Sequence, residues 1–69
     1  MEEAQLKGRI LSLIDEHSKS AVHGARESTV FQQLSEEGVS KDRALEAIRK
    51  LNLEGRVFRP VVGYLRRLR

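Results

Sequence analysis

The chain has 69 residues, of which 39% are hydrophobic and 33% charged, and it carries a net charge of +3. A domain of this size buries only about 60% of the surface that its unfolded chain exposes, which leaves little room for an internal catalytic cleft. The sequence contains no cysteine, which excludes disulfides, thiolate zinc sites and thiol nucleophiles, and no apolar run of about 18 residues that would span a membrane.

The first predicted element is an amphipathic helix over about residues 3–17. Its apolar stripe recurs at helical spacing and consists of Leu6, Ile10, Leu11, Leu13 and Ile14. A polar run, residues 18–20, ends this pattern. Residues 21–26 are predicted to form a loop with or without one short strand.

A second helix is predicted over about residues 29–37. Thr29 and Gln32 have the spacing of a capping box, with Ser28 as the alternative N-cap. The buried face of this helix is predicted to consist of Val30, Phe31 and Leu34. Gly38 suits the left-handed position that follows the end of many helices.

A third helix is predicted over about residues 41–54, with Ser40 as its N-cap. Its predicted apolar stripe consists of Ala44, Leu45, Ile48 and Leu51. A turn of about three residues between two helices, here residues 38–40, is typical of a helix-turn-helix unit.

The remainder of the chain, about residues 56–68, changes to a strand pattern. Two runs of β-branched, aromatic and basic side chains flank a connection, residues 60–63, that begins with Pro and ends with Gly, which predicts a β-hairpin. At least two of the three aromatic residues, Phe31, Phe58 and Tyr64, are expected in the core. The order of the elements predicts an α+β fold of the winged-helix class: residues 1–69 form one domain with three helices, a C-terminal hairpin wing and room for a short third strand.

The sequence carries no catalytic or metal-binding constellation. His17 and His23 have no carboxylate pair or cysteine placed to complete a metal set. The glycines do not form a phosphate-binding loop, and no serine lies in a nucleophile-elbow pattern. We therefore expect no enzyme activity, no metal and no cofactor in this chain.

The predicted third helix is nearly neutral. The face opposite its apolar stripe carries Asp42, Arg43, Glu46, Arg49, Lys50 and Leu53. Residues 41–54 contain four basic and three acidic side chains, and each carboxylate repels the phosphates that the cations attract. Base reading in the major groove, for which helix-turn-helix proteins use this helix, is therefore disfavoured.

The C-terminal hairpin is the better candidate for nucleic-acid contact. No acidic residue follows Glu54, whereas arginines are frequent there. We expect weak, salt-sensitive, sequence-independent contact with DNA phosphates from Arg59, Arg66 and Arg67, supported by Arg49, Lys50, Arg56 and Arg69. The alternative is that these arginines only prevent an edge hairpin from pairing with other chains.

Three apolar residues offer a different surface. Leu53 points away from the apolar stripe of the third helix, and Val61 and Val62 lie at the tip of the hairpin, where polar residues are usual. They are candidates for contact with a protein partner. The alternative for Leu53 is that it packs beneath the wing.

The segment from Glu54 to Leu65 resembles the end of the archaeal-type minichromosome-maintenance (MCM) replicative DNA helicases. That family ends in a winged helix with the pattern Glu-Gly-x-Ile-Tyr-x-Pro-x-x-Gly-Tyr-Leu. The matching positions are Glu54, Gly55, Pro60, Gly63, Tyr64 and Leu65, while Val57 and Phe58 replace the Ile-Tyr pair. These positions are structural, so the resemblance assigns no catalytic or ligand residue.

The resemblance implies an accessory, regulatory module of a hexameric, ATP-driven helicase whose motor lies outside this chain. It implies as partners DNA, other domains or subunits of the helicase, and loading or replication factors. A cytoplasmic location, or a nuclear one in a eukaryote, is expected, without membrane association. Two other functions stay open: a module that binds only proteins, and a free-standing DNA-binding transcription regulator, against which the neutral third helix and the lack of a dimerisation element argue.

Overall fold

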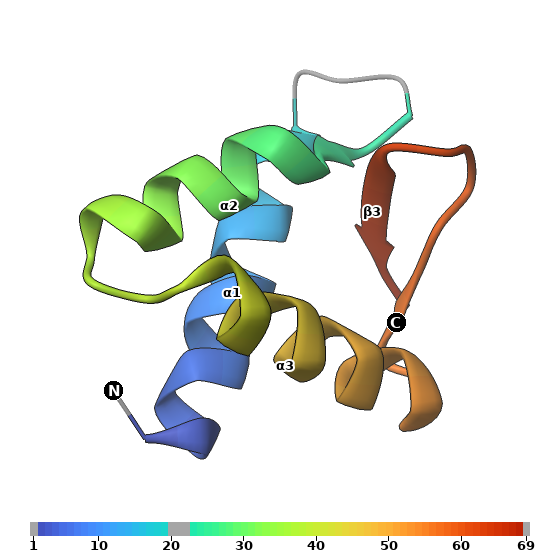
Figure 1. The fold of residues 1–69 in the computed structure, drawn as a ribbon. Coiled ribbons are helices and arrows are strands. Elements are labelled where there is room, and N and C mark those ends of the chain that lie inside the picture. The colour runs from blue at the N-terminus through green and yellow to red at the C-terminus, as the bar shows by residue number, and fades with distance from the viewer. Residues whose placement is uncertain (1, 20–22, 69) are drawn as a thin grey trace.

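Three helices and a small antiparallel sheet make up the fold, which the computed structural model describes for residues 2–19 and 23–68 (Figure 1). The helices are α1 (Glu3–Ser18), α2 (Glu27–Glu36) and α3 (Lys41–Leu53), and the strands are β1 (Ala25–Arg26), β2 (Val57–Phe58) and β3 (Tyr64–Arg67). The predicted α+β class and winged-helix-like arrangement are confirmed. None of the helices in the described ranges is long and apolar enough to cross a membrane.

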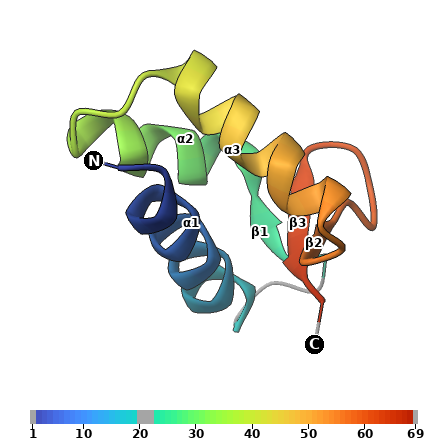
Figure 2. The ribbon, with the colours of Figure 1, turned by 90° about the horizontal axis from the view of Figure 1, so that it is seen from below.

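The last strand of the chain is the central strand of the sheet. Both neighbours pair with it antiparallel, in the order β1-β3-β2 (Figure 2). Ala25 lies opposite Leu65, and Val57 lies opposite Arg67. Strand β1 is the short strand for which the sequence left room before the second helix.

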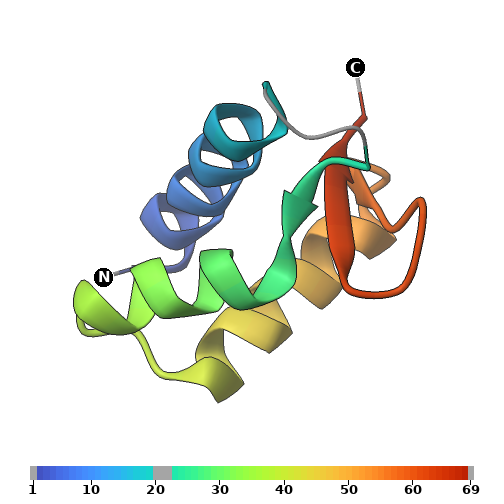
Figure 3. The ribbon, with the colours of Figure 1, turned by 90° about the horizontal axis from the view of Figure 1, so that it is seen from above.

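The core lies between the helices and the inner face of the sheet. Ala25, Val57 and Leu65 point inward from the three strands and are at most 1% exposed. The α1 residues predicted as its stripe, Leu6, Ile10, Leu11, Leu13 and Ile14, are all buried. Helix α1 contacts both β1 and β3, and Figure 3 shows it alongside these strands. Apolar burial on this one face is the main stabilising term of such a fold.

Helix α2 begins two residues before its predicted start, at Glu27, and the capping-box prediction is wrong. Thr29 lies inside the helix, and the N-cap residue, Arg26, makes no side-chain cap hydrogen bond. The reason is that β1 runs directly into α2. The backbone N–H of Glu27 donates to the carbonyl oxygen of Gly63 at 2.9 Å, so the hairpin satisfies a donor that a cap would otherwise satisfy.

The turn between α2 and α3 has the predicted geometry. Gly38 adopts a φ of 87°, a left-handed conformation that glycine reaches without a steric cost. The next N–H, of Val39, donates to the Leu34 carbonyl at 2.9 Å, which completes a Schellman motif. The Ser40 hydroxyl then accepts from the N–H of Arg43 and caps α3, as predicted.

Two predictions about the core are wrong. Leu45, predicted in the apolar stripe of α3, is 38% exposed, and Ala47 is buried instead. Ala47 faces α1, whereas Leu45 lies on the side of α3 that faces the hairpin. All three aromatic residues, Phe31, Phe58 and Tyr64, are only partly buried, because the fully buried positions are filled by aliphatic side chains.

Candidate nucleic-acid interface

A groove of about 540 Å³ lies between α3 and the hairpin. Its lining consists of Leu45, Ile48, Arg49, Asn52, Val57, Arg59 and Leu65. The apolar members form a floor that is continuous with the core, and Arg49 and Arg59 approach from the α3 side and the hairpin side. No carboxylate of the described residues lines this groove. It is therefore a locally cationic surface on a chain whose overall charge is nearly balanced.

The α3 side of the groove follows from helical spacing. Leu45, Arg49 and Asn52 occupy positions i, i+4 and i+7, which fall on one helix face. The side-chain amide of Asn52 donates to the carbonyl oxygen of Val57 at 3.0 Å and fixes this face against β2. Leu45 and Asn52 were not among the predicted site residues, although their shared spacing with Arg49 carried the signal.

Arg59 has an intramolecular partner that the sequence did not reveal. Its Nε contacts a carboxylate oxygen of Glu27, the first residue of α2, at 2.8 Å. Half of the Arg59 side chain is exposed, and exposed ion pairs contribute only about 0–1 kcal/mol. A guanidinium has five N–H donors, so Arg59 retains donors for a second anionic group.

The two neighbouring arginines of β3 lie on opposite faces of the sheet, because successive strand residues alternate. Arg67, on the inner face, donates to a carboxylate oxygen of Asp15 on α1 at 2.6 Å. Arg66, on the outer face, lies opposite Phe58. The hairpin thus divides its arginines among the groove, the α1 side and the outer face of the sheet.

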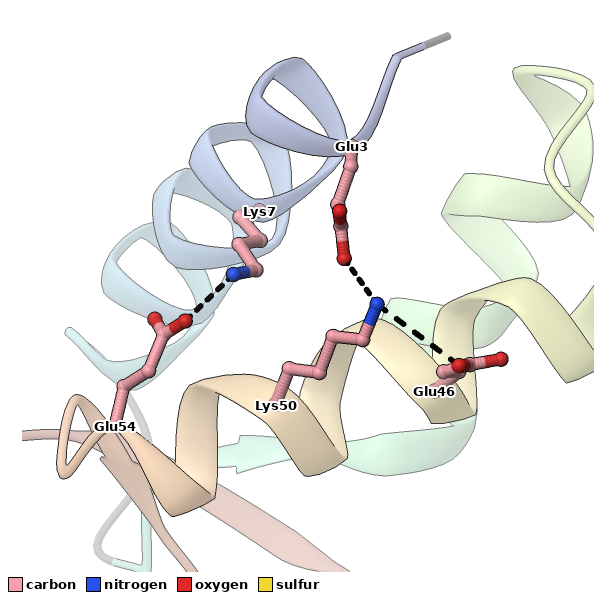
Figure 4. Close-up of polar contacts among 5 residues, drawn as sticks. All are labelled: Glu3, Lys7, Glu46, Lys50 and Glu54. Atoms are coloured by element: carbon pink, nitrogen blue, oxygen red, sulfur yellow. Dashed lines mark hydrogen bonds and ion pairs between the residues drawn. The ribbon is translucent and has the colours of Figure 1, made fainter.

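Lys50 faces α1 and not the hairpin. It forms ion pairs with Glu3 of α1 and, at 3.9 Å, with Glu46 one turn earlier on α3 (Figure 4). The hydrogen bond with Lys50 lowers the pKa of Glu3, and the same hydrogen bond raises the pKa of Lys50. Consecutive helical residues are separated by about 100° around the axis, which is why Arg49 lines the groove and Lys50 does not.

Arg56 also lies away from the groove, beside Lys7 and Glu54, which form a 2.6 Å ion pair between α1 and the end of α3 (Figure 4). Arg69 lies outside the described residues. Of the predicted phosphate contacts among the described residues, Arg49 and Arg59 line this groove, whereas Arg66 and Arg67 line a separate hollow beside Asp15 and Lys19.

The three apolar candidates for protein contact are exposed. Leu53 is 74% exposed, Val61 41% and Val62 97%. Leu53 ends α3, where the chain enters the hairpin, whereas the valines lie in the loop at the far end of the hairpin (Figure 1). They therefore form two separate apolar points and not one patch.

The described ranges contain no group of three or more His, Asp or Glu side chains placed to hold a metal ion. Comparison with known proteins identifies no matching family, no similar characterised protein and no similar solved structure.

Proposed function

We propose that this chain is a non-catalytic winged-helix module that binds DNA through its phosphates in the groove between α3 and the hairpin. One observation carries the proposal: Arg49 and Arg59 line the same groove, and no carboxylate of the described residues lines it. Arginine binds phosphate oxygens in a bidentate geometry. The apolar floor between the two arginines suits contact with the sugars of the backbone.

The charge of the surroundings sets the expected strength of this binding. Asp42 and Glu46 are exposed on α3, and Arg59 is partly neutralised by Glu27. A few phosphate contacts of this kind give an affinity that falls steeply with salt and depends little on base sequence. The module therefore fits an accessory role better than that of a selective reader of operator sites.

The resemblance of residues 54–65 to the end of MCM helicases supports a specific context. There the module would act as a regulatory domain beside an ATP-driven motor, with DNA, other helicase subunits and loading factors as partners. Weak and sequence-independent DNA contact suits a domain that is carried along DNA by a motor.

Fluorescence anisotropy of a labelled DNA duplex tests the groove. The groove variant R49A/R59A is compared with K50A/R56A, which removes the same charge on the side that faces α1. At low salt we expect the groove variant to weaken binding at least tenfold and to reduce the slope of log affinity against log salt by about 1–2, since about two phosphate contacts are lost. The control variant is expected to weaken binding only slightly.

Two results would contradict the proposal. Equal loss in the two variants would mean that net charge alone attracts DNA. Absence of duplex binding by the wild-type chain at low salt would overturn the proposed role of the groove. Thermal melting of both variants, followed by circular dichroism, ensures that the compared chains are folded.

Protein binding is the second candidate, favoured by the exposure of Leu53 and Val62. Large apolar side chains in contact with water often mark interaction sites. Under this alternative Leu53, Val61 and Val62 take no part in DNA binding, so the variant L53S/V61S/V62S retains whatever affinity the wild-type chain has for duplex DNA. A loss of DNA affinity in this variant would assign the three residues to the DNA surface instead.

A further inference from the structure

The outer face of the sheet carries a compact set of aromatic and cationic side chains. Arg26 of β1 lies opposite Tyr64 of β3, and Phe58 of β2 lies opposite Arg66 of β3. Directly opposed residues share a face, so all four side chains emerge on the side away from the core. Each arginine thus has an aromatic ring as its cross-strand neighbour.

The contacts around Tyr64 hold its ring in place. A guanidinium nitrogen of Arg26 donates to the Tyr64 hydroxyl at 3.2 Å, and the guanidinium carbon lies 5.8 Å from the ring centroid. The ring of His23 meets Tyr64 edge to face, with centroids 5.6 Å apart. An aromatic ring fixed in this way requires little ordering when a flat ligand stacks on it.

The side chains on the outer face differ in type and exposure from those on the inner face, and formation of the core does not require this difference. On the inner face Ala25, Val57 and Leu65 are aliphatic and at most 1% exposed, whereas Phe58 and Tyr64 on the outer face stay partly open to solvent. The buried residues of the described helices pack against the inner face, and only the C-terminal end of α1 and the N-terminal part of α2 border the outer-face residues. The strands contain no acidic residue. Two carboxylates border this face, and both are ion-paired: Asp15 with Arg67 and Glu27 with Arg59. The partly exposed rings and the arginines beside them therefore suit a ligand that is both flat and anionic.

We propose that the outer face of the sheet is a stacking platform for a single-stranded nucleic acid. Bases stack on Tyr64 and Phe58, while Arg26 and Arg66 contact the phosphates between them. The platform is two aromatic rings long and takes two or three nucleotides. This inference rests on the proposed nucleic-acid function, but it concerns a different surface from the groove and an unpaired strand in place of a duplex.

Tyr64 supplies a direct measurement, because it is the single tyrosine of a chain without tryptophan. Intrinsic tyrosine fluorescence is followed while an oligothymidylate strand of about 12 nucleotides is added at low salt. A strand of the same length that consists of abasic sites serves as the control with equal charge. We expect the oligothymidylate to quench the fluorescence, after correction for absorption, and the abasic strand to leave it nearly unchanged.

Paired variants separate the platform from the groove. Replacement of both rings by leucine, F58L/Y64L, keeps apolar volume but removes the stacking faces. Stacking by one base contributes about tenfold or more to affinity, so we expect at least tenfold weaker binding of the labelled single strand and duplex binding within twofold of wild type. The groove variant R49A/R59A is expected to show the reverse pattern.

The outcomes are distinguishable. If wild type binds duplex but oligothymidylate neither binds nor quenches Tyr64, the platform is overturned and the proposed function stands. If quenching is equal with the abasic strand, the contact is electrostatic and the stacking role is overturned. If wild type binds neither strand form, both proposals fail. The fluorescence experiment uses the wild-type chain, so its result does not depend on the stability of a variant.

Discussion

At residue 24 the backbone passes so close to β3 that a side chain has no space. Gly24 has a φ of 102°, and a Cβ built there would lie 2.4 Å from the carbonyl oxygen of Leu65 and 2.4 Å from Cγ of Arg66. Main-chain atoms of a central strand cannot move aside without loss of pairing. Gly24 thus allows the segment before β1 to lie against the strand that closes the core.

The substitution Gly24→Ala is therefore expected to lower the free energy of unfolding by about 2 kcal/mol or more, through backbone strain and the clash with β3. Gly8→Ala provides the matched control, since Gly8 lies inside α1 with open space around it. Alanine favours a helix interior by up to about 1 kcal/mol over glycine, so this variant is expected to be more stable than wild type. Urea denaturation of both variants measures the two effects, and equal destabilisation would contradict the close approach at residue 24.

Among the elements, a bidentate ion pair joins α1 to the end of α2. Arg9 Nε donates to both carboxylate oxygens of Glu37, at 3.0 and 3.1 Å, and its terminal nitrogen donates to one of them at 2.7 Å. The hydrogen bonds from Arg9 lower the pKa of Glu37, and those to Glu37 raise the pKa of Arg9. This pair supports the turn between α2 and α3 from outside the core.

The lowered pKa of Glu37 has a defined consequence for acid stability. The unfolded state binds its proton near the ordinary value of 4.5, before the folded state does. The stabilisation from this group is therefore complete above pH 4.5 and is lost as the pH falls through the folded pKa. We expect Glu37→Gln to melt at a slightly lower temperature than wild type at pH 7, with the difference shrinking toward pH 3. A constant difference over this range would show that the ion pair does not carry the effect.

Two leucines of α3 are expected to differ strongly in their contribution to stability. Leu51 is fully buried, whereas Leu45 is 38% exposed at the groove. Truncation of a buried leucine to alanine typically costs about 2–5 kcal/mol, because it leaves a cavity. We expect Leu51→Ala to fall in this range and Leu45→Ala to cost less than about 1.5 kcal/mol. Chemical denaturation of both variants at one pH measures the contrast, and similar losses would contradict the position of Leu45.

Elements whose structure depends on residues close to one another in the sequence were predictable. The stripe of α1 and the turn at Gly38 and Ser40 depend on local spacing, and the structure confirms them. The start of α2 depends on a hydrogen bond from Glu27 to Gly63, which no local pattern contains. The competing capping signal at Thr29 was therefore misleading.

The candidate site was predictable only in part. Arg49 and Arg59 were both selected from charge, but charge alone does not reveal that Lys50 faces α1 while Arg49 faces the groove. That distinction requires knowing on which side of α3 the helix α1 packs. The pairing of Arg67 with Asp15 was equally hidden, because it joins residues far apart in the chain.

For the whole molecule, strand β3 is the element on which the others depend. It pairs with both other strands, and its residue Leu65 is completely buried between them and the helices. Without β3, strands β1 and β2 have no partner, and the inner face of the sheet is lost. An isolated short strand is not stable in water.

A chain that ends at Gly63 is therefore expected to lose its cooperative thermal unfolding transition. The control ends at Arg67, which removes the half-exposed Leu68 and its hydrogen bond to the carbonyl of Arg56. This control is expected to keep the transition at a slightly lower temperature. Circular dichroism melting curves compare the two chains, and a cooperative transition in the shorter one would mean that the helices form a stable unit by themselves.

Glu27, the first residue of α2, makes two contacts with the wing. The N–H of Glu27 donates to the carbonyl of Gly63, and its carboxylate binds Arg59. These two tethers join both ends of the wing loop to one helix terminus, so the loop cannot swing independently of α2. A phosphate that binds the remaining donors of Arg59 shares the guanidinium with Glu27, which weakens this ion pair and loosens the hydrogen bond beside it. Binding of a phosphate in the groove is then expected to speed hydrogen–deuterium exchange at the backbone amide of Glu27. A change at the wing loop would thus affect the start of α2 while the core keeps its arrangement.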